Sequence, residues 1–400
     1  MSNSADSMTK TKMFNLKFST ILPINKIPKE LNQNPSIVNT ANPMIFISKF
    51  TGYALFSFNP RTFKVCFTKF DIFALFATIC VSLALNCIYW KSIVEAGVNV
   101  NQISRASFPI LVYSDYLVNI ASTGWIFLNR NKISELLKSF RGIDENFIEV
   151  GIQFDYGRQR LTVIKSIALV LIGMTFWISL DLYIIITSKF INDLQFTIII
   201  FWSNLCMILQ IHHHVAIINA IKSRAMELQQ ALHQKSPNIQ KTSKIHLEII
   251  EIISNFNRIF SPIMLLYFAN GFAWSCISIF DIVTFPDAVW SNLLSPALLV
   301  GGHCAMEFLI VFIVIYSVEG VKVEFDKLKK ICCRLLNDTN GNERMEVEVS
   351  KFLTQVTTLE VKFTGGVIDF DWKLLFKFAT ACIMYFVILV QFHGSFEDKK

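Results

Sequence analysis

The sequence predicts an all-α membrane protein with seven transmembrane helices, a cytosolic amino terminus and an extracellular carboxyl terminus. Hydrophobic residues make up 53% of its 400 residues and charged residues only 17%, against roughly 25% charged residues in a soluble protein. Seven windows approach the roughly 20 apolar residues that a helix needs to cross a bilayer. They are Ile72 to Trp90, Phe108 to Leu128, Ile167 to Thr187, Phe196 to Ile218, Phe260 to Ile282, Leu293 to Tyr316 and Leu374 to Phe392.

Lysine and arginine are unevenly placed between these windows, and their placement predicts the orientation. Most of the 37 basic residues lie before the first window and in the second, fourth and sixth connections, whereas the other connections and the last tail hold few. Basic flanks are retained on the cytosolic side of a membrane. The asymmetry therefore predicts a multi-pass plasma-membrane protein with a cytosolic amino terminus. It also explains the net charge of +7 without nucleic acid as a partner.

The inner connections are long, and they are predicted to continue the transmembrane helices into the cytosol. "AIKSRAMELQQALHQ" and "VKVEFDKLKKICCRLL" both follow a window without a break. The later stretch "MEVEVSKFLTQVTTLEVKF" is amphipathic but too charged to cross a bilayer, so it predicts a cytosolic packing helix. Gly365 and Gly366 come next and predict a hinge, because each glycine weakens a helix by about 1 kcal/mol. Asp369 or Asp371 can cap the final transmembrane helix.

Cysteine and histidine predict neither disulfides nor a metal site. The predicted outer connections contain no cysteine, so no disulfide framework is expected. Residues 212–214 are three consecutive histidines. Successive helix positions point about 100° apart, so these three rings cannot converge on one ion.

The last window ends in a recognisable motif. Tyr385 is followed by five apolar residues and then by Gln391 and Phe392. This pattern resembles TYhhhhhQF, the last-helix signature of insect gustatory receptors in which h is any apolar residue, with Met384 at the usual threonine position. "KFTGGVIDFDWKLLFKF" and "MIFISKFTGYALFSFNPRTF" are similar to other segments of that family. Sugar-receptor members tend to carry an acidic residue after the tyrosine, where this chain has Phe386, which argues against the sweet-sensing branch.

The resemblance implies a tetrameric, ligand-gated, non-selective cation channel whose ligand is a small-molecule tastant. The tetramer would contain one kind of subunit or related receptors, and monovalent and divalent cations would pass through it. No cofactor is expected. The implied parts are a cytosolic amino-terminal segment (1–71), a six-helix ligand-binding transmembrane domain (72–316), a cytosolic assembly region (317–373), a pore-lining seventh helix (374–392) and a short extracellular tail (393–400).

Helical spacing indicates how the last helix could form a pore. Met384, Ile388 and Gln391 share one stripe, and Tyr385 and Phe392 belong to the next. In a fourfold bundle the first stripe would form apolar rings and a ring of amides near the outer mouth, which is the arrangement of a gate. The alternative is that Gln391 lies at a helix interface, where amides are tolerated.

Polar and aromatic residues in the outer half of the other spans are the candidates for a ligand pocket. Polar groups at this depth are unfavourable in lipid unless they meet a partner, a cavity or water. Asp115, Trp177, Trp274 and His303 are the main candidates, and Glu307 follows His303 by one helical turn. An aromatic site with a few hydrogen-bonding groups suits a small organic ligand. The alternative for each residue is a contact between helices.

Other functional classes fit the sequence less well. A G-protein-coupled receptor has an extracellular amino terminus, opposite to the predicted orientation. A secondary transporter would favour an internal repeat and interrupted helices, although His303 and Glu307 leave that class open. The chain has no nucleophile elbow, phosphate loop or HExxH pattern, so an enzyme is not predicted. A channel subunit of the insect odorant receptor type, which needs a partner, is the main alternative.

Overall fold

The structure, a computed structural model, describes most of the chain beyond residue 101. It covers residues 102–188, 194–234, 237–284, 294–338 and 342–397, together with 57, 58, 65, 66 and five positions between 73 and 87. These residues all lie in one compact unit, Ile37–Lys400. The other unit, Met1–Ser36, lies outside the described residues.

Helices contain nearly all of the described residues. They are α3 (Gln102–Leu128), α4 (Arg130–Glu149), α5 (Tyr156–Ser188), α6 (Leu194–Leu232), α7 (Ile239–Thr284), α9 (Leu294–Asn337), α10 (Glu343–Thr358) and α11 (Trp372–Glu397). A short antiparallel pair, β1 (Ser57–Phe58) and β2 (Val65–Cys66), precedes them with Ser57 opposite Cys66. The predicted all-α class is confirmed.

Five of the described helices contain a stretch long and apolar enough to cross a membrane. The stretches are Tyr156–Leu180, Phe201–Leu232, Ile239–Phe280, Cys304–Asn337 and Trp372–Gln391. They overlap the third to seventh predicted windows. The second predicted window lies within the continuous helix α3. Most of the first lies outside the described residues, and its five described positions are helical.

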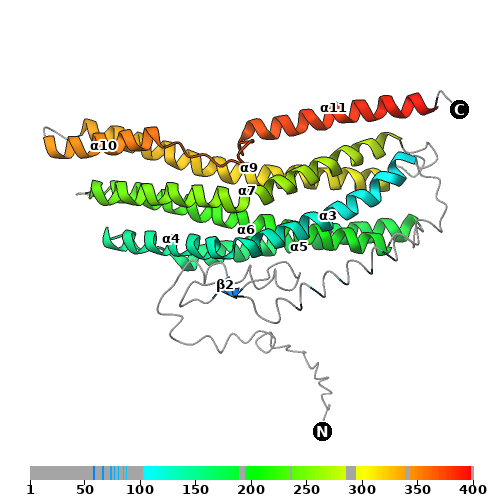
Figure 1. Cartoon of the computed structure of the whole chain (residues 1–400), viewed down its shortest axis with the longest axis horizontal. Helices are drawn as coiled ribbons and strands as arrows, with labels where there is room; N and C mark the ends of the chain where they lie inside the picture. The colour runs from blue at the N-terminus through cyan, green and yellow to red at the C-terminus, as the bar shows by residue number, and fades with distance from the viewer. Residues whose placement is uncertain are drawn as a thin grey trace, which may run out of the picture. The chain divides into compact units, whose positions relative to one another are not determined.

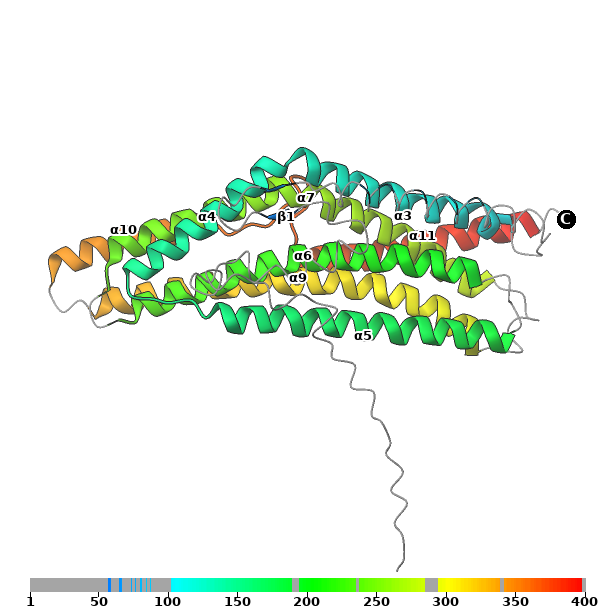
Figure 2. The same cartoon turned by 90° about the horizontal axis from the view of Figure 1, so that it is seen from below.

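Helices α6, α7 and α9 are longer than a bilayer is thick. They have 39, 46 and 44 residues, or about 60–70 Å at 1.5 Å per residue, against a hydrocarbon core of about 30 Å. Figures 1 and 2 show α3 and α11 beside one end of these helices and α4 and α10 beside the other. The predicted long helical extensions are therefore confirmed.

Two halves of the molecule follow from this arrangement. The membrane half consists of α3, α5 and α11 with residues 194–221 of α6, 259–284 of α7 and 294–321 of α9. The extension half consists of α4 and α10 with residues 222–232, 239–258 and 322–337 of the same long helices.

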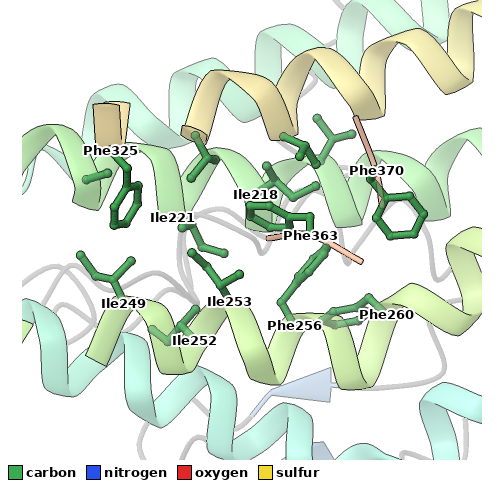
Figure 3. Packing of buried hydrophobic residues seen from close by; sticks show 14 of the residues in the cluster. Ile218, Ile221, Ile249, Ile252, Ile253, Phe256, Phe260, Phe325, Phe363 and Phe370 are labelled. Atoms are coloured by element: carbon green, nitrogen blue, oxygen red, sulfur yellow. The ribbon is translucent and has the colours of Figure 1, made fainter. Parts of the chain in front are cut away.

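A hydrophobic core runs between the long helices. Ile249, Ile252, Ile253 and Phe256 of α7 are at most 3% exposed, and Figure 3 shows them near Ile218 and Ile221 of α6 and Phe325 of α9. Helix α10 adds Val349, Phe352 and Val356 to this core. The apolar face of α10 was predicted from helical spacing. Burial of these side chains is what attaches the amphipathic helix α10 to α7 and α9.

Residues 359–371 connect α10 to α11 through a tight turn. The amide of Gly365 donates to the carbonyl of Ile368 at 2.8 Å, and the amide of Phe370 donates to the carbonyl of Phe363 at 2.9 Å. Gly366 has a φ of 88°, a conformation that glycine adopts without steric cost. A Cβ on Gly365 would overlap Leu265 of α7. The turn's backbone conformation therefore favours glycine at 366, whereas at 365 a side chain would have to displace Leu265.

Helix α7 and an aspartate fix the two ends of this connector. The Asn257 side chain donates to the carbonyl of Lys362 at 2.7 Å and accepts from the amide of Thr364 at 3.2 Å. The carboxylate of Asp371 accepts from the amide of Leu374 at 3.0 Å, so Asp371 caps α11, as one of the two predicted candidates. The connector is thus held by α7 just before α11 begins.

Candidate functional site

Asp115 is the centre of a buried polar cluster in the membrane half. Its Oδ1 atom accepts from the indole nitrogen of Trp274 at 2.7 Å and from the side-chain amide of Asn270 at 2.5 Å. The hydroxyl of Ser114 donates to the side-chain oxygen of Asn270 at 2.6 Å. Two of the four predicted pocket residues, Asp115 and Trp274, are therefore in direct contact. The bonds join α3 to α7.

A third helix contributes polar groups to the same cluster. Asn119 lies one turn after Asp115 on α3, and its amide donates to the hydroxyl of Ser203 on α6 at 3.3 Å. Ser203 also lies within hydrogen-bonding reach of Asp115. All three side chains are at least nine-tenths buried. The polar groups thus meet between α3, α6 and α7.

Glu307 reaches the cluster from α9. The side chain is 5% exposed, and a Cβ added at Gly271 of α7 would overlap its carboxylate. The absence of a side chain at Gly271 therefore lets a carboxylate lie against the backbone of α7. Among the described residues, none donates a hydrogen bond to Glu307. The sequence pattern had placed Glu307 one helical turn after His303 without showing which helix it faces.

The other two predicted pocket residues are Trp177, which packs against α9, and His303, which belongs to α9. The ring of Trp177 on α5 packs directly on Gly302, where a Cβ would overlap it. This contact places Trp177 against α9, not in the hydrogen-bonded group around Asp115. His303 is the next residue of α9, and its side chain lies outside the described residues. The pocket roles of both residues stay predictions.

Asn270 and Ser203 belong to the cluster although neither was predicted as a site residue. Asn270 lies one helical turn before Trp274, so the two side chains share a face of α7. That spacing was available in the sequence and could have indicated that Asn270 belongs with Trp274. The partner across the interface was not available, because Trp274 and Asp115 are 159 residues apart.

The opposite face of the same stretch of α7 contacts the last helix. Phe272 packs against Tyr385 and Phe378 of α11, with ring centroids 5.4 and 5.8 Å apart. Phe378 also contacts Phe308 of α9 at 5.2 Å. Residues 270–274 of α7 therefore touch α3, α9 and α11 within little more than one helical turn. A shift of this turn would act on the polar cluster and on α11 together.

Helix α11 leaves its predicted pore stripe exposed in the single chain. Met384 is 61% and Ile388 41% exposed, and Gln391 is exposed as well. Tyr385, on the next stripe, turns toward Phe272. Phe392 lies in α11, but its side chain lies outside the described residues. An uncovered apolar stripe next to an amide is consistent with a surface that meets other subunits.

The three consecutive histidines take three different surroundings. His212 shares a hydrogen bond with Ser166 of α5 at 2.8 Å, His213 one with the carbonyl of Leu209 at 2.8 Å, and the ring of His214 packs on Phe260 of α7. Within the described part of the chain, no group of three His, Cys, Asp or Glu residues is placed to hold a metal ion.

Comparisons with known proteins agree with this fold. No curated protein matches the sequence. Two similar solved structures are of the insect olfactory receptor OR5 from Machilis hrabei, with and without eugenol. The eugenol complex has a TM-score of 0.58 and 12% identity, and covers 88% of this chain and 98% of that one. The structure without eugenol has a TM-score of 0.58 and 13% identity, and covers 89% of this chain and 98% of that one. At this identity the likeness shows the fold alone.

The family is shown by a match along most of the sequence. Residues 41–395 match the model of the 7tm chemosensory receptor family. This range includes the motif from Tyr385 to Phe392, on which the resemblance to insect chemoreceptors was based. It also includes the polar cluster around Asp115 and the connector before α11. The chain belongs to the 7tm chemosensory receptor family.

Proposed function

We propose that the chain is a gustatory receptor that acts as a tastant-gated, non-selective cation channel. Four subunits, identical or related, surround a pore lined by α11, with Met384, Ile388 and Gln391 toward the ions and Tyr385 and Phe392 beside them. The amino terminus is cytosolic and the carboxyl terminus extracellular, in the plasma membrane. The family match and the motif at the end of α11 support this proposal. The exposed stripe on α11 supplies the surface that it requires.

The observation that carries the proposal is the contact pattern of α7. Asn270 and Trp274 hold Asp115 on one face of this helix, and Phe272 packs on Tyr385 of α11 from the other. A ligand that binds at the cluster changes the hydrogen bonds on the first face. The resulting shift of α7 displaces the ring of Phe272, and with it α11. Ligand binding and pore opening are thereby linked through one helical turn.

The connector before α11 supplies a hinge for this movement. Gly365 and Gly366 form its turn, and Asn257 holds the backbone on both sides of Phe363. Helix α11 can therefore tilt about a point that is attached to α7. Residues 317–373, which include α10, would hold the four subunits together in the cytosol while α11 moves.

The test is to express the full chain in oocytes and to record currents during application of a tastant panel. Gln391→Ala is expected to change ion selectivity and rectification, because it removes the ring of amides from the pore. Phe272→Ala is expected to lower the maximal current while ligand binding is kept, because it uncouples α7 from α11. Gln230→Ala, on an exposed position of α6, is the matched control. A functional Gln391→Ala channel with wild-type selectivity and rectification would exclude the pore role.

An odorant receptor-type subunit is the second candidate, because the similar solved structures are insect olfactory receptors. Such a subunit needs a partner chain to conduct. Injecting the chain alone and together with a related receptor separates the two possibilities. Currents from the chain alone support the gustatory receptor, whereas currents that appear only after co-expression support the partner-dependent subunit.

A further inference from the structure

Two acidic side chains are buried close together in the membrane half. Asp115 of α3 and Glu307 of α9 are each 5% exposed, and they approach adjacent residues of α7, because Asn270 bonds Asp115 and Gly271 lies against the carboxylate of Glu307. No Lys or Arg occurs in residues 106–128, 194–221, 259–284 or 294–321, which form α3, α6, α7 and α9 at this level. Among the described residues, these carboxyl groups therefore have no positively charged partner.

Neutral hydrogen-bond donors satisfy only part of the cluster. Asn270 and Trp274 both donate to the same oxygen of Asp115. Glu307 receives no hydrogen bond from the described residues, and the side-chain oxygen of Asn119, itself 1% exposed, also has no partner. At Glu307 and Asn119, acceptors therefore meet no donor among the described residues, although unpartnered donors also occur on these helices, on Ser122, Gln210 and Ser275. A buried acceptor without a donor is unfavourable, and more so when it carries a charge.

Two buried carboxyl groups without a basic partner among the described residues favour a positively charged group from outside the chain. Buried carboxylates need a counter-ion or must take up a proton, and two of them in one site repel each other. The extension half shows the arrangement that this protein uses for a structural carboxylate. There Asp144 is paired with the guanidinium of Arg224 at 2.8 Å. The membrane half has the same kind of buried acid without the arginine.

We propose that Asp115 and Glu307 bind the charged nitrogen of a protonated amine, and that amines are the ligand class of this receptor. The inference rests on the proposed function and specifies its ligand. An ammonium group carries up to three N–H donors, which match the acceptors on Asp115, Glu307 and Asn119. Trp274, hydrogen-bonded to Asp115, presents aromatic surface to the cation or to the apolar part of the amine.

The test compares amines with alcohols of the same shape. The probes are phenethylamine against 2-phenylethanol, tryptamine against indole-3-ethanol, and pentylamine against pentanol, all at neutral pH where the amines are protonated. Binding is measured as the rise in melting temperature of the purified full-length protein, and gating as current in oocytes. We expect at least one amine to bind about tenfold or more tightly than its alcohol, because only the amine supplies the counter-charge.

Asp115→Asn and Glu307→Gln keep the shape of each side chain and remove its charge. Each variant is expected to weaken amine binding about tenfold or more, to the level of the matching alcohol. The melting temperature without ligand reports whether each variant is folded. Glu319→Gln is the control, because Glu319 also lies on α9 but pairs with Lys322 at 2.8 Å, outside the cluster. It is expected to leave amine binding unchanged.

Three results would overturn the inference. In the first, no amine of the panel raises the melting temperature. In the second, the alcohols bind as tightly as the matching amines. In the third, Asp115→Asn and Glu307→Gln both still bind amines more tightly than alcohols. The proposed function fails separately. Amines that bind but open no current in surface-expressed protein would leave the amine site intact and remove the channel. Currents opened only by neutral tastants would support the channel and exclude amines as its ligand class.

Discussion

Two buried aspartates, one in each half of the molecule, have opposite surroundings. Asp144 of α4 receives the guanidinium of Arg224 at 2.8 Å and the hydroxyl of Tyr156 on the same carboxylate oxygen. Arg224 is itself fully buried and lies over the rings of Phe140 and Phe154, at 4.6 and 5.0 Å. Asp115 of α3 receives only neutral donors, and its partner Asn270 is adjacent to Gly271, against which the carboxylate of Glu307 lies.

The difference separates a structural ion pair from the proposed binding site. The charge of Asp144 is compensated within the chain, so this aspartate can attach α4 to α6 and to the start of α5 in every state of the protein. The charge of Asp115 is not compensated by any described residue. Its hydrogen bonds position the carboxylate, and in the proposed amine site the ligand supplies the counter-charge.

The largest effect is expected at Arg224. Arg224→Met leaves Asp144 buried without a counter-ion, which should lower the free energy of unfolding by about 3–5 kcal/mol. Thermal unfolding of the purified protein measures this. Adding Asp144→Leu should recover much of the loss, because an apolar pair can replace a buried ion pair.

An exposed ion pair gives the matched control for Arg224. Arg141 and Glu145 are 2.7 Å apart with side chains 54% and 60% exposed, and Arg141→Met should change the free energy of unfolding by less than about 1 kcal/mol. If Arg224→Met changed the free energy of unfolding as little as Arg141→Met, Arg224 would not stabilise the extension half. Asp144 could then not be called a structural aspartate in contrast to Asp115.

A smaller effect is expected at Asn257, where α7 holds the connector to α11. Asn257→Leu removes two hydrogen bonds, to Lys362 and Thr364, and should lower the free energy of unfolding by about 1–2 kcal/mol. It should also reduce the maximal ligand-evoked current, because the connector before α11 is no longer held by α7. Asn255→Leu, two residues away on α7 and bonded only to Arg258 among the contacts shown, should leave the current near that of the wild type. Equal currents in the two variants would contradict this link.

Hydropathy and helical spacing predicted most of the fold. Apolar stretches of about 20 residues reveal membrane helices because the bilayer imposes their length. The apolar faces of α7 and α10 follow from a period of 3.6 residues, as the burial of Ile252 and Phe352 shows. The separation of α10 from α11 was predicted from Gly365 and Gly366, because both are poor helix formers.

The partners of the candidate site residues could not be predicted in the same way. Asp115 and Trp274 were chosen one by one for their depth in the membrane, and their contact depends on how α3 packs against α7. Arg224 was not singled out at all, since its partner Asp144 lies 80 residues earlier on another helix. Spacing within one helix shows which residues share a face, whereas packing between helices decides which faces meet.

The smallest change in stability is expected at Asp115. This change tests whether Asp115, unlike Asp144, is dispensable for the fold. In Asp115→Asn the side-chain oxygen can still accept from Asn270 and Trp274, and the amide can donate to Ser203. The variant also removes a charge beside Glu307, so the free energy of unfolding should change by less than about 1 kcal/mol. Asp144→Asn, measured in parallel by thermal unfolding, should lose about 3–5 kcal/mol, because it leaves Arg224 buried without a counter-ion. Equal losses in the two variants would mean that both aspartates serve the fold, and the charge of Asp115 would then need no ligand to explain it.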